Sequence, residues 1–243
     1  MKKLLFALII VFNVLITQGQ NQNQNDRVGS KNQIGLTVTD LINGTLQLNY
    51  ERLLGKHISV NLGVGLKGEE GLVSLSGLDT EQLKTNDITY SGFKIIPEVR
   101  YYLNKTQTNK LDGFYFGAYL KYTQFQSDLN GTYINDAQET FDLEFDANIK
   151  VTSVGFMVGY KLPLSKRFYL DFLIAGPGAG FYNFSFVNKK DLPEEFYEDF
   201  NAALDKYSIF DFLSSDFRFN STNKKSDFVL PSFRYGITLA YSF

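Results

Sequence analysis

The stretch "FRYGITLAYSF", residues 233–243, ends the chain and shows the pattern that decides its fold. Every second residue is large and apolar: Phe233, Tyr235, Ile237, Leu239, Tyr241 and Phe243. The residues between them, such as Gly236 and Ala240, are small or polar. Successive side chains of a β-strand point to opposite faces, so this alternation is typical of a strand with one apolar face.

The same alternation recurs along the chain. Seven further segments show it: 34–41, 45–54, 57–66, 91–103, 113–124, 153–162 and 168–176. With the closing segment they predict eight strands, an even number as in closed antiparallel barrels. Ile149 and Val151 break the parity of the segment that begins at Val154, so we expect a β-bulge near Thr152.

The less apolar face of these strands carries charges. They are Glu51, Lys94, Glu98, Arg100, Lys121, Lys161, Asp171 and Arg234. In a soluble sandwich or ligand-binding barrel this face would meet water, and the apolar face would form the core. The charged face is also rich in glycine and serine, which favours the reverse arrangement, with charges inside and apolar residues facing lipid.

The connections favour the same arrangement. Segments 67–89, 127–147 and 187–227 predict long loops, whereas 54–57, 104–112 and 163–167 predict short turns. Long loops on one side and short turns on the other are typical of transmembrane barrels, with the long side outside the cell. Six outward aromatic residues near the short turns resemble an interfacial girdle: Tyr50, Tyr101, Phe114, Tyr160, Phe168 and Phe243.

The start of the chain predicts export. "MKKLLFALIIVFNVLITQGQ" has two lysines, an apolar run and then small residues, which is the layout of a signal peptide over residues 1–19. Its apolar run is shorter than the roughly 20 residues of a spanning helix. We expect a flexible polar tail at 20–33 and a barrel at 34–243. The formal charge of −2 argues against a nucleic-acid partner.

Three motifs carry a family resemblance: "LNYERLLGKHISVNLGVGL" at 48–66, "IIPEVRYYLN" at 95–104 and "LDGFYFGAYLKY" at 111–122. With them the chain resembles small outer-membrane barrels of Bacteroidota, similar in architecture to the barrels of OmpA and OmpX. The ending resembles the C-terminal signal by which such barrels engage their assembly machinery, with Tyr241 and Phe243 at the matching positions. The resemblance implies an outer-membrane location and contact with outer-membrane lipid.

The inward charges have two interpretations. A packed network of ion pairs would plug the lumen, because an eight-stranded barrel is only just wide enough for its own side chains. The alternative is a narrow channel. A lipid-modifying enzyme is a third possibility on this scaffold, but the one histidine, His57, lies in a predicted short turn at the periplasmic side. We therefore expect no catalytic residue, no cofactor and no metal.

The last long loop predicts a helix. Asp191 and Glu194 have capping-box spacing, with Pro193 between them. Phe196, Phe200, Leu204 and Tyr207 follow at helical spacing. This helix could cover the barrel mouth or present an aromatic surface to a glycan or protein. The expected fold is thus an all-β, eight-stranded antiparallel transmembrane barrel with long extracellular loops, one of them helical. The expected function is non-enzymatic, either structural or binding through those loops.

Overall fold

The computed structural model describes residues 31–69, 71, 76–77, 79–87, 89–103, 111–206, 220 and 225–243. Its elements are β1 (Asn32–Thr37), η1 (Thr39–Asn43), β2 (Thr45–Leu53), β3 (Ile58–Lys67), β4 (Leu83–Thr85), β5 (Ser91–Tyr102), β6 (Gly113–Ile134), β7 (Thr140–Pro163), β8 (Phe168–Asn188), α2 (Glu194–Lys206) and β9 (Lys225–Ser242). No helix in these ranges is long and apolar enough to cross a membrane.

Eight of the strands close into a ring in which every neighbouring pair is antiparallel. Starting from β1, the ring runs through β2, β3, β5, β6, β7, β8 and β9. It is closed by β9 pairing with β1, from Gln33↔Ser242 to Thr37↔Thr238. The short β4 lies outside the ring and pairs with β6. The predicted all-β, eight-stranded antiparallel barrel is confirmed, and the terminal stretch is the strand that closes it.

The alternation in sequence becomes the two faces of the barrel wall. On β3, the apolar residues from Ile58 to Leu66 are exposed, while Ser59 and Asn61 between them are buried. On β5, Val99 is 53% exposed, whereas its neighbours Glu98 and Arg100 are 5% and 7% exposed. Charged and polar side chains therefore fill the lumen, and the outer surface of the barrel is apolar.

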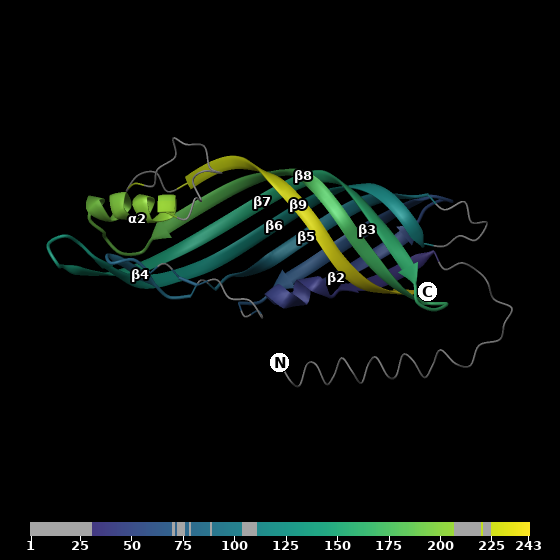
Figure 1. Cartoon of the computed structure of the whole chain (residues 1–243), viewed down its shortest axis with the longest axis horizontal. Helices are drawn as coiled ribbons and strands as arrows, with labels where there is room; N and C mark the ends of the chain where they lie inside the picture. Colours follow the sequence, from purple (N-terminus) through teal and green to yellow (C-terminus); the bar gives the residue numbers. More distant parts are fainter. Residues whose placement is uncertain are drawn as a thin grey trace, which may run out of the picture.

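Four strands extend well beyond the rest of the ring, and one of them, β9, has 18 residues and pairs with β8 as far as Ser185. β6, β7 and β8 have 22, 24 and 21 residues, whereas β2 has nine. The predicted long loop at 127–147 is therefore wrong, because only residues 135–139 separate β6 from β7. Asn135 forms that turn: its Oδ1 accepts a hydrogen bond from the Glu139 amide at 2.8 Å. We call the projecting ends of these long strands the extension. The extension and α2 lie at the end of the molecule opposite the C-terminus (Figure 1).

The inner face changes character where the barrel meets this extension. Along β7, Ser153 and Lys161 face the lumen, but Leu143 and Phe145, on the same face further along, belong to an apolar cluster with residues of α2. Ile149 and Val151 continue that apolar face, so no bulge is needed near Thr152, where pairing with β6 is unbroken. The predicted bulge is wrong at this position. A register shift lies instead in β8, between Leu173 and Gly176.

Candidate functional site

The centre of the lumen is occupied by the guanidinium of Arg100, which projects from β5. Its Nη1 donates to Glu51 on β2 at 3.1 Å and to Asp171 on β8 at 2.6 Å. Its Nε and Nη2 donate to Glu98 Oε2 at 2.9 and 2.6 Å. One arginine therefore joins three buried carboxylates from three strands, and the planar fork of the guanidinium suits such multiple contacts.

A second buried cation completes the network toward the end of the barrel with the C-terminus. Lys161 on β7 pairs with Glu51, lies 3.7 Å from Asp171, and donates to Gln33 Oε1 at 2.8 Å. Glu51 also accepts hydrogen bonds from Ser59 at 2.6 Å and Tyr102 at 2.8 Å. Buried charges are stable only when paired and hydrogen-bonded, and these partners meet that requirement.

Aromatic rings fill the space beside the ion pairs. The Tyr115 hydroxyl donates to Asp171 Oδ1 at 2.8 Å, and the Arg100 guanidinium lies 4.7 Å from the centre of the Tyr115 ring. A Cβ at Gly159 would lie 2.3 Å from this tyrosine, so glycine is required there to admit the ring. This explains an inward glycine on β7: it provides room for a bulky side chain from β6.

The remaining predicted charges lie on the other side of Arg100, toward the extension. Arg234 on β9 donates to Glu98 Oε1 at 2.8 Å, and Lys94 pairs with Asp40 of η1. Lys121 makes no ion pair with any residue in the described part of the chain. The structure thus brings seven of the eight predicted charges into paired contacts and leaves Lys121 beside them.

The two halves of the lumen differ in free space. Toward the extension there is a cavity of about 360 Å³, bordered by Lys94, Lys121 and Arg234. Toward the end with the C-terminus, a pocket beside Gln33 and Lys161 has a free volume of only about 10 Å³. A water molecule needs roughly 10–15 Å³ of such volume, so this pocket has room for about one water at most. Arg100 and Asp171 border both spaces, so the ion-pair network lies between them.

Comparison with known proteins places this barrel in a family. A family model described as protein of unknown function (DUF3575) matches residues 6–195. The chain belongs to DUF3575. No curated protein matches the sequence of this DUF3575 chain. Among solved structures, CarO of Acinetobacter baumannii is similar, with 13% identity, coverage of 91% of this chain and 100% of that chain, and a TM-score of 0.39. The barrel assignment of the DUF3575 chain rests on its own strand pairing.

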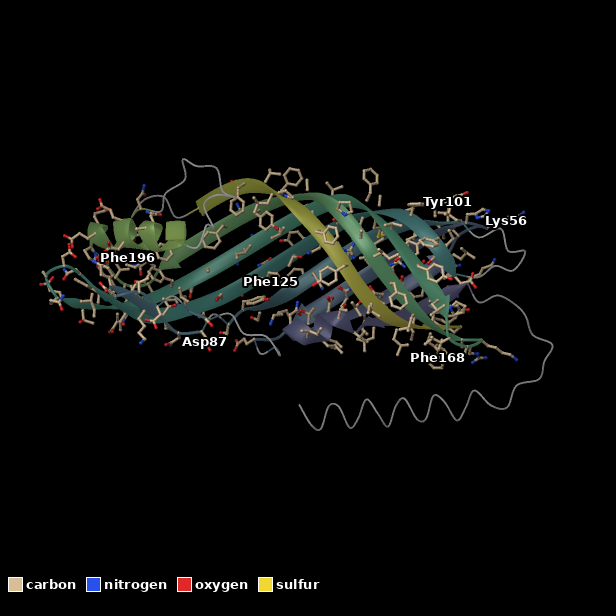
Figure 2. The ribbon with its side chains drawn as sticks, viewed as in Figure 1. Lys56, Asp87, Tyr101, Phe125, Phe168 and Phe196 are labelled. Carbon is tan, nitrogen blue, oxygen red and sulfur yellow. The ribbon has the colours of Figure 1, made fainter. Side chains whose placement is uncertain are left out.

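The aromatic residues predicted to form a loop-binding surface in the DUF3575 chain are buried where the structure describes their side chains. Phe196 and Phe200 are 0% and 6% exposed, because α2 turns them onto the inner face of the extension. Phe196 packs on Tyr133, Phe145 and Phe200, with ring centroids 5.3–5.5 Å apart. The Leu204 side chain and Tyr207 lie outside the described residues. Figure 2 shows Phe196 at the end opposite Phe168 and Tyr101.

At the end of the barrel with the C-terminus, the histidine and the two predicted assembly-signal residues make hydrogen bonds and ring contacts within the barrel. His57 Nδ1 lies 2.9 Å from the Tyr102 carbonyl oxygen, and its ring stacks on Tyr101. Tyr241 accepts a hydrogen bond from Arg167 at 2.8 Å and packs edge-on against Phe168. The Phe243 amide donates to the Asn32 carbonyl oxygen at 3.0 Å. Recognition of Tyr241 and Phe243 by assembly machinery remains a prediction.

Several contributors to the lumen were missed at the sequence level. Asp40, the partner of Lys94, lies in η1, whereas the sequence placed residues 34–41 in a strand. Gln33, Ser59 and Tyr102 complete the network but carry no charge, so a pattern of inward charges does not include them. For Ser59 and Tyr102 the available signal was their inward parity, whereas Gln33 falls in the segment expected to be a tail and lies in β1.

Proposed function

We propose that this chain is a non-enzymatic barrel of the outer membrane, closed to solute flow and carrying a folded extracellular extension. The observation that carries the proposal is the inverted distribution of polarity. Apolar side chains such as Leu62, Val99 and Phe156 are 47–76% exposed on the outer wall, while charged side chains are buried in the lumen. Lipid is the solvent in which this inside-out arrangement is stable, and a closed ring leaves no strand edge unpaired.

The two ends of the barrel support an orientation. The end with the C-terminus has short turns and outward aromatic residues, among them Phe114 and Tyr160 at 5.0 Å between ring centroids. Such residues suit the boundary between lipid and headgroups. The opposite end carries the long extension, which suits the extracellular side. The predicted signal peptide at 1–19 and the resemblance to small Bacteroidota barrels support the same location.

The extension supports a binding or structural role outside the membrane. A strand crosses the hydrocarbon core with roughly 9–11 residues, so β6, β7 and β8, at 21–24 residues, project far beyond it. Helix α2 buries its aromatic residues against this projecting sheet. The extension is therefore a folded platform with its own core, and a partner would meet the outer faces of α2 and the strands.

Membrane fractionation and gel mobility test the proposal. We expect the chain in the outer-membrane fraction, released only by detergent, and we expect the unboiled protein to migrate faster than the boiled one. In planar bilayers it should give no steady conductance, because the ion-pair network blocks the lumen. Recovery in the soluble fraction would overturn the membrane location. Stepwise conductance would instead support a channel, and release of fatty acid from purified lipopolysaccharide would support an enzyme.

A further inference from the structure

The lumen cavity carries more positive than negative charge. Four basic side chains border it, Lys94, Arg100, Lys121 and Arg234, and three acidic ones, Asp40, Glu98 and Asp171. Asp171 is also shared with Lys161 on the closed side. The described wall of the cavity therefore has an excess of at least one positive charge.

That excess is located at Lys121. Lys94 is paired with Asp40, while Arg100 and Arg234 share Glu98. Lys121 has no carboxylate within ion-pairing distance among the described residues, and it lies close enough to Lys94 and Arg234 to be repelled by both, with Asp40 as a source of attraction. A partly buried cation with cationic neighbours lacks the counter-charge that such a group requires.

Two buried polar atoms beside Lys121 also lack partners. Thr123, next on the same face of β6, is 1% exposed and borders the cavity, and its Oγ1 has no hydrogen-bond partner. Arg234 uses Nη2 for Glu98 and stacks 4.4 Å above the Tyr119 ring, but its buried Nη1 has no partner. Buried polar groups in folded proteins are nearly always satisfied, so an unpaired hydroxyl and an unpaired guanidinium nitrogen around one space point to a ligand there.

The rest of the wall indicates what that ligand carries besides charge. Hydroxyl and amide groups of Thr37, Thr45, Gln47 and Asn49 line the cavity from β1 and β2. Tyr90 and Phe125, with ring centroids 5.2 Å apart, border it toward the extension. Amides and hydroxyls bind sugar hydroxyls, and aromatic rings bind the apolar face of a sugar. The volume of about 360 Å³ lies within the roughly 300–1,000 Å³ of small-molecule sites.

We propose that the cavity binds a small hydroxylated carboxylate, a sugar acid of the hexuronate class, with its carboxylate facing Lys121 and Arg234. The hydroxyl groups of the sugar then face the Thr37 hydroxyl of β1 and the amides of β2. The site is closed at Arg100, so the ligand enters and leaves from the end that carries the extension. This proposal concerns the lumen and does not depend on what the outer faces of the extension bind.

Calorimetric titration of the detergent-solubilised full chain tests the proposal, with glucuronate as the probe. Glucose and acetate serve as comparisons, because each keeps only one half of the proposed ligand. We expect glucuronate to bind at least tenfold more tightly than either. Equal binding of acetate would show that charge alone is recognised, and equal binding of glucose that charge is irrelevant. Either result, or the absence of glucuronate binding, would overturn the proposal.

Two substitutions locate the site. Lys121→Gln should weaken glucuronate binding at least tenfold, whereas Lys84→Gln, at an exposed lysine of β4, should leave it unchanged. Thr123→Glu places a carboxylate beside Lys121 and should abolish binding while raising the melting temperature. The difference in mobility between boiled and unboiled samples verifies that each variant is folded. Unaltered affinity in folded Lys121→Gln or Thr123→Glu would exclude this site.

Discussion

The guanidinium of Arg100 and the carboxylate of Asp171 meet across the barrel lumen, with Nη1 and Oδ2 2.6 Å apart. They come from β5 and β8, which are separated by β6 and β7 on one side of the ring. This contact, with that to Glu51 on β2, ties different walls of the barrel together through one side chain.

Arg100→Met should therefore be strongly destabilising. It leaves Glu51, Glu98 and Asp171 with fewer cationic partners in a buried space. Removing one partner from a buried ion-pair network costs about 3–5 kcal/mol, and we expect a loss of that size in the free energy of unfolding. Urea unfolding of the protein in lipid vesicles measures it. Arg52→Met, at an exposed arginine of β2, is the control. Equal stability of the two variants would contradict a stabilising role for the ion pairs of Arg100.

Phe196→Ala should release α2 without opening the barrel. Phe196 is fully buried between rings of the extension, and truncating a buried phenylalanine costs about 3–5 kcal/mol. Hydrogen exchange of the 194–206 amides should accelerate, while the mobility of the unboiled protein stays unchanged. The matched control is Glu198→Ala, at an exposed position of the same helix. If Phe196→Ala also removed the fast-migrating form, the extension and barrel would be one cooperative unit.

The docking of α2 should weaken in alkali. The buried Tyr133 hydroxyl donates to Asp199 of α2 at 2.6 Å, and burial, followed by this carboxylate, raises the pKa of Tyr133 above its usual 10.0. The folded state therefore holds the proton more tightly than the released state. The stabilising effect of the hydrogen bond between Tyr133 and Asp199 is complete below pH 10 and declines as the pH rises above that value. Proteolysis within α2 should accelerate as the pH rises above 10.

Tyr133→Phe distinguishes this effect from general alkaline unfolding. The variant lacks the titrating hydroxyl, so the additional acceleration above pH 10 should disappear. Its docking at pH 8 should be weaker by about 1.5–3 kcal/mol, the typical value of a hydrogen bond to a charged group. A variant with the same alkaline acceleration as the natural protein would assign the effect to another group.

Phe156→Arg should impair membrane assembly. Phe156 is 76% exposed on the outer wall of β7, and a basic residue at the lipid face costs roughly 2–4 kcal/mol at the bilayer midplane. The fraction of fast-migrating protein recovered after refolding into vesicles measures the effect. Phe156→Leu keeps the surface apolar and should assemble normally. Normal assembly of Phe156→Arg would indicate that this wall does not face lipid.

The sequence predicted the barrel because a period of two is a local signal that survives in every strand. It also predicted which charges face inward, since Glu98 and Arg100 share a parity. It did not predict that Lys121 would lack a partner or that Asp40 would meet Lys94, because those contacts depend on which walls face each other across the lumen. The long strands were missed for a related reason: the inner face of β7 turns from polar to apolar at Val151, and this change resembled a bulge.

That change of polarity along one continuous face has an evolutionary consequence. The β6–β7 hairpin ends in a tight turn at residues 135–139, and its strands are paired up to that turn. If each of the two strands gained or lost two residues at matching positions, every remaining side chain would stay on its original face. Homologues can therefore lengthen or shorten this arm by even steps and acquire new surfaces at its tip while the lumen and its ion pairs are inherited unchanged.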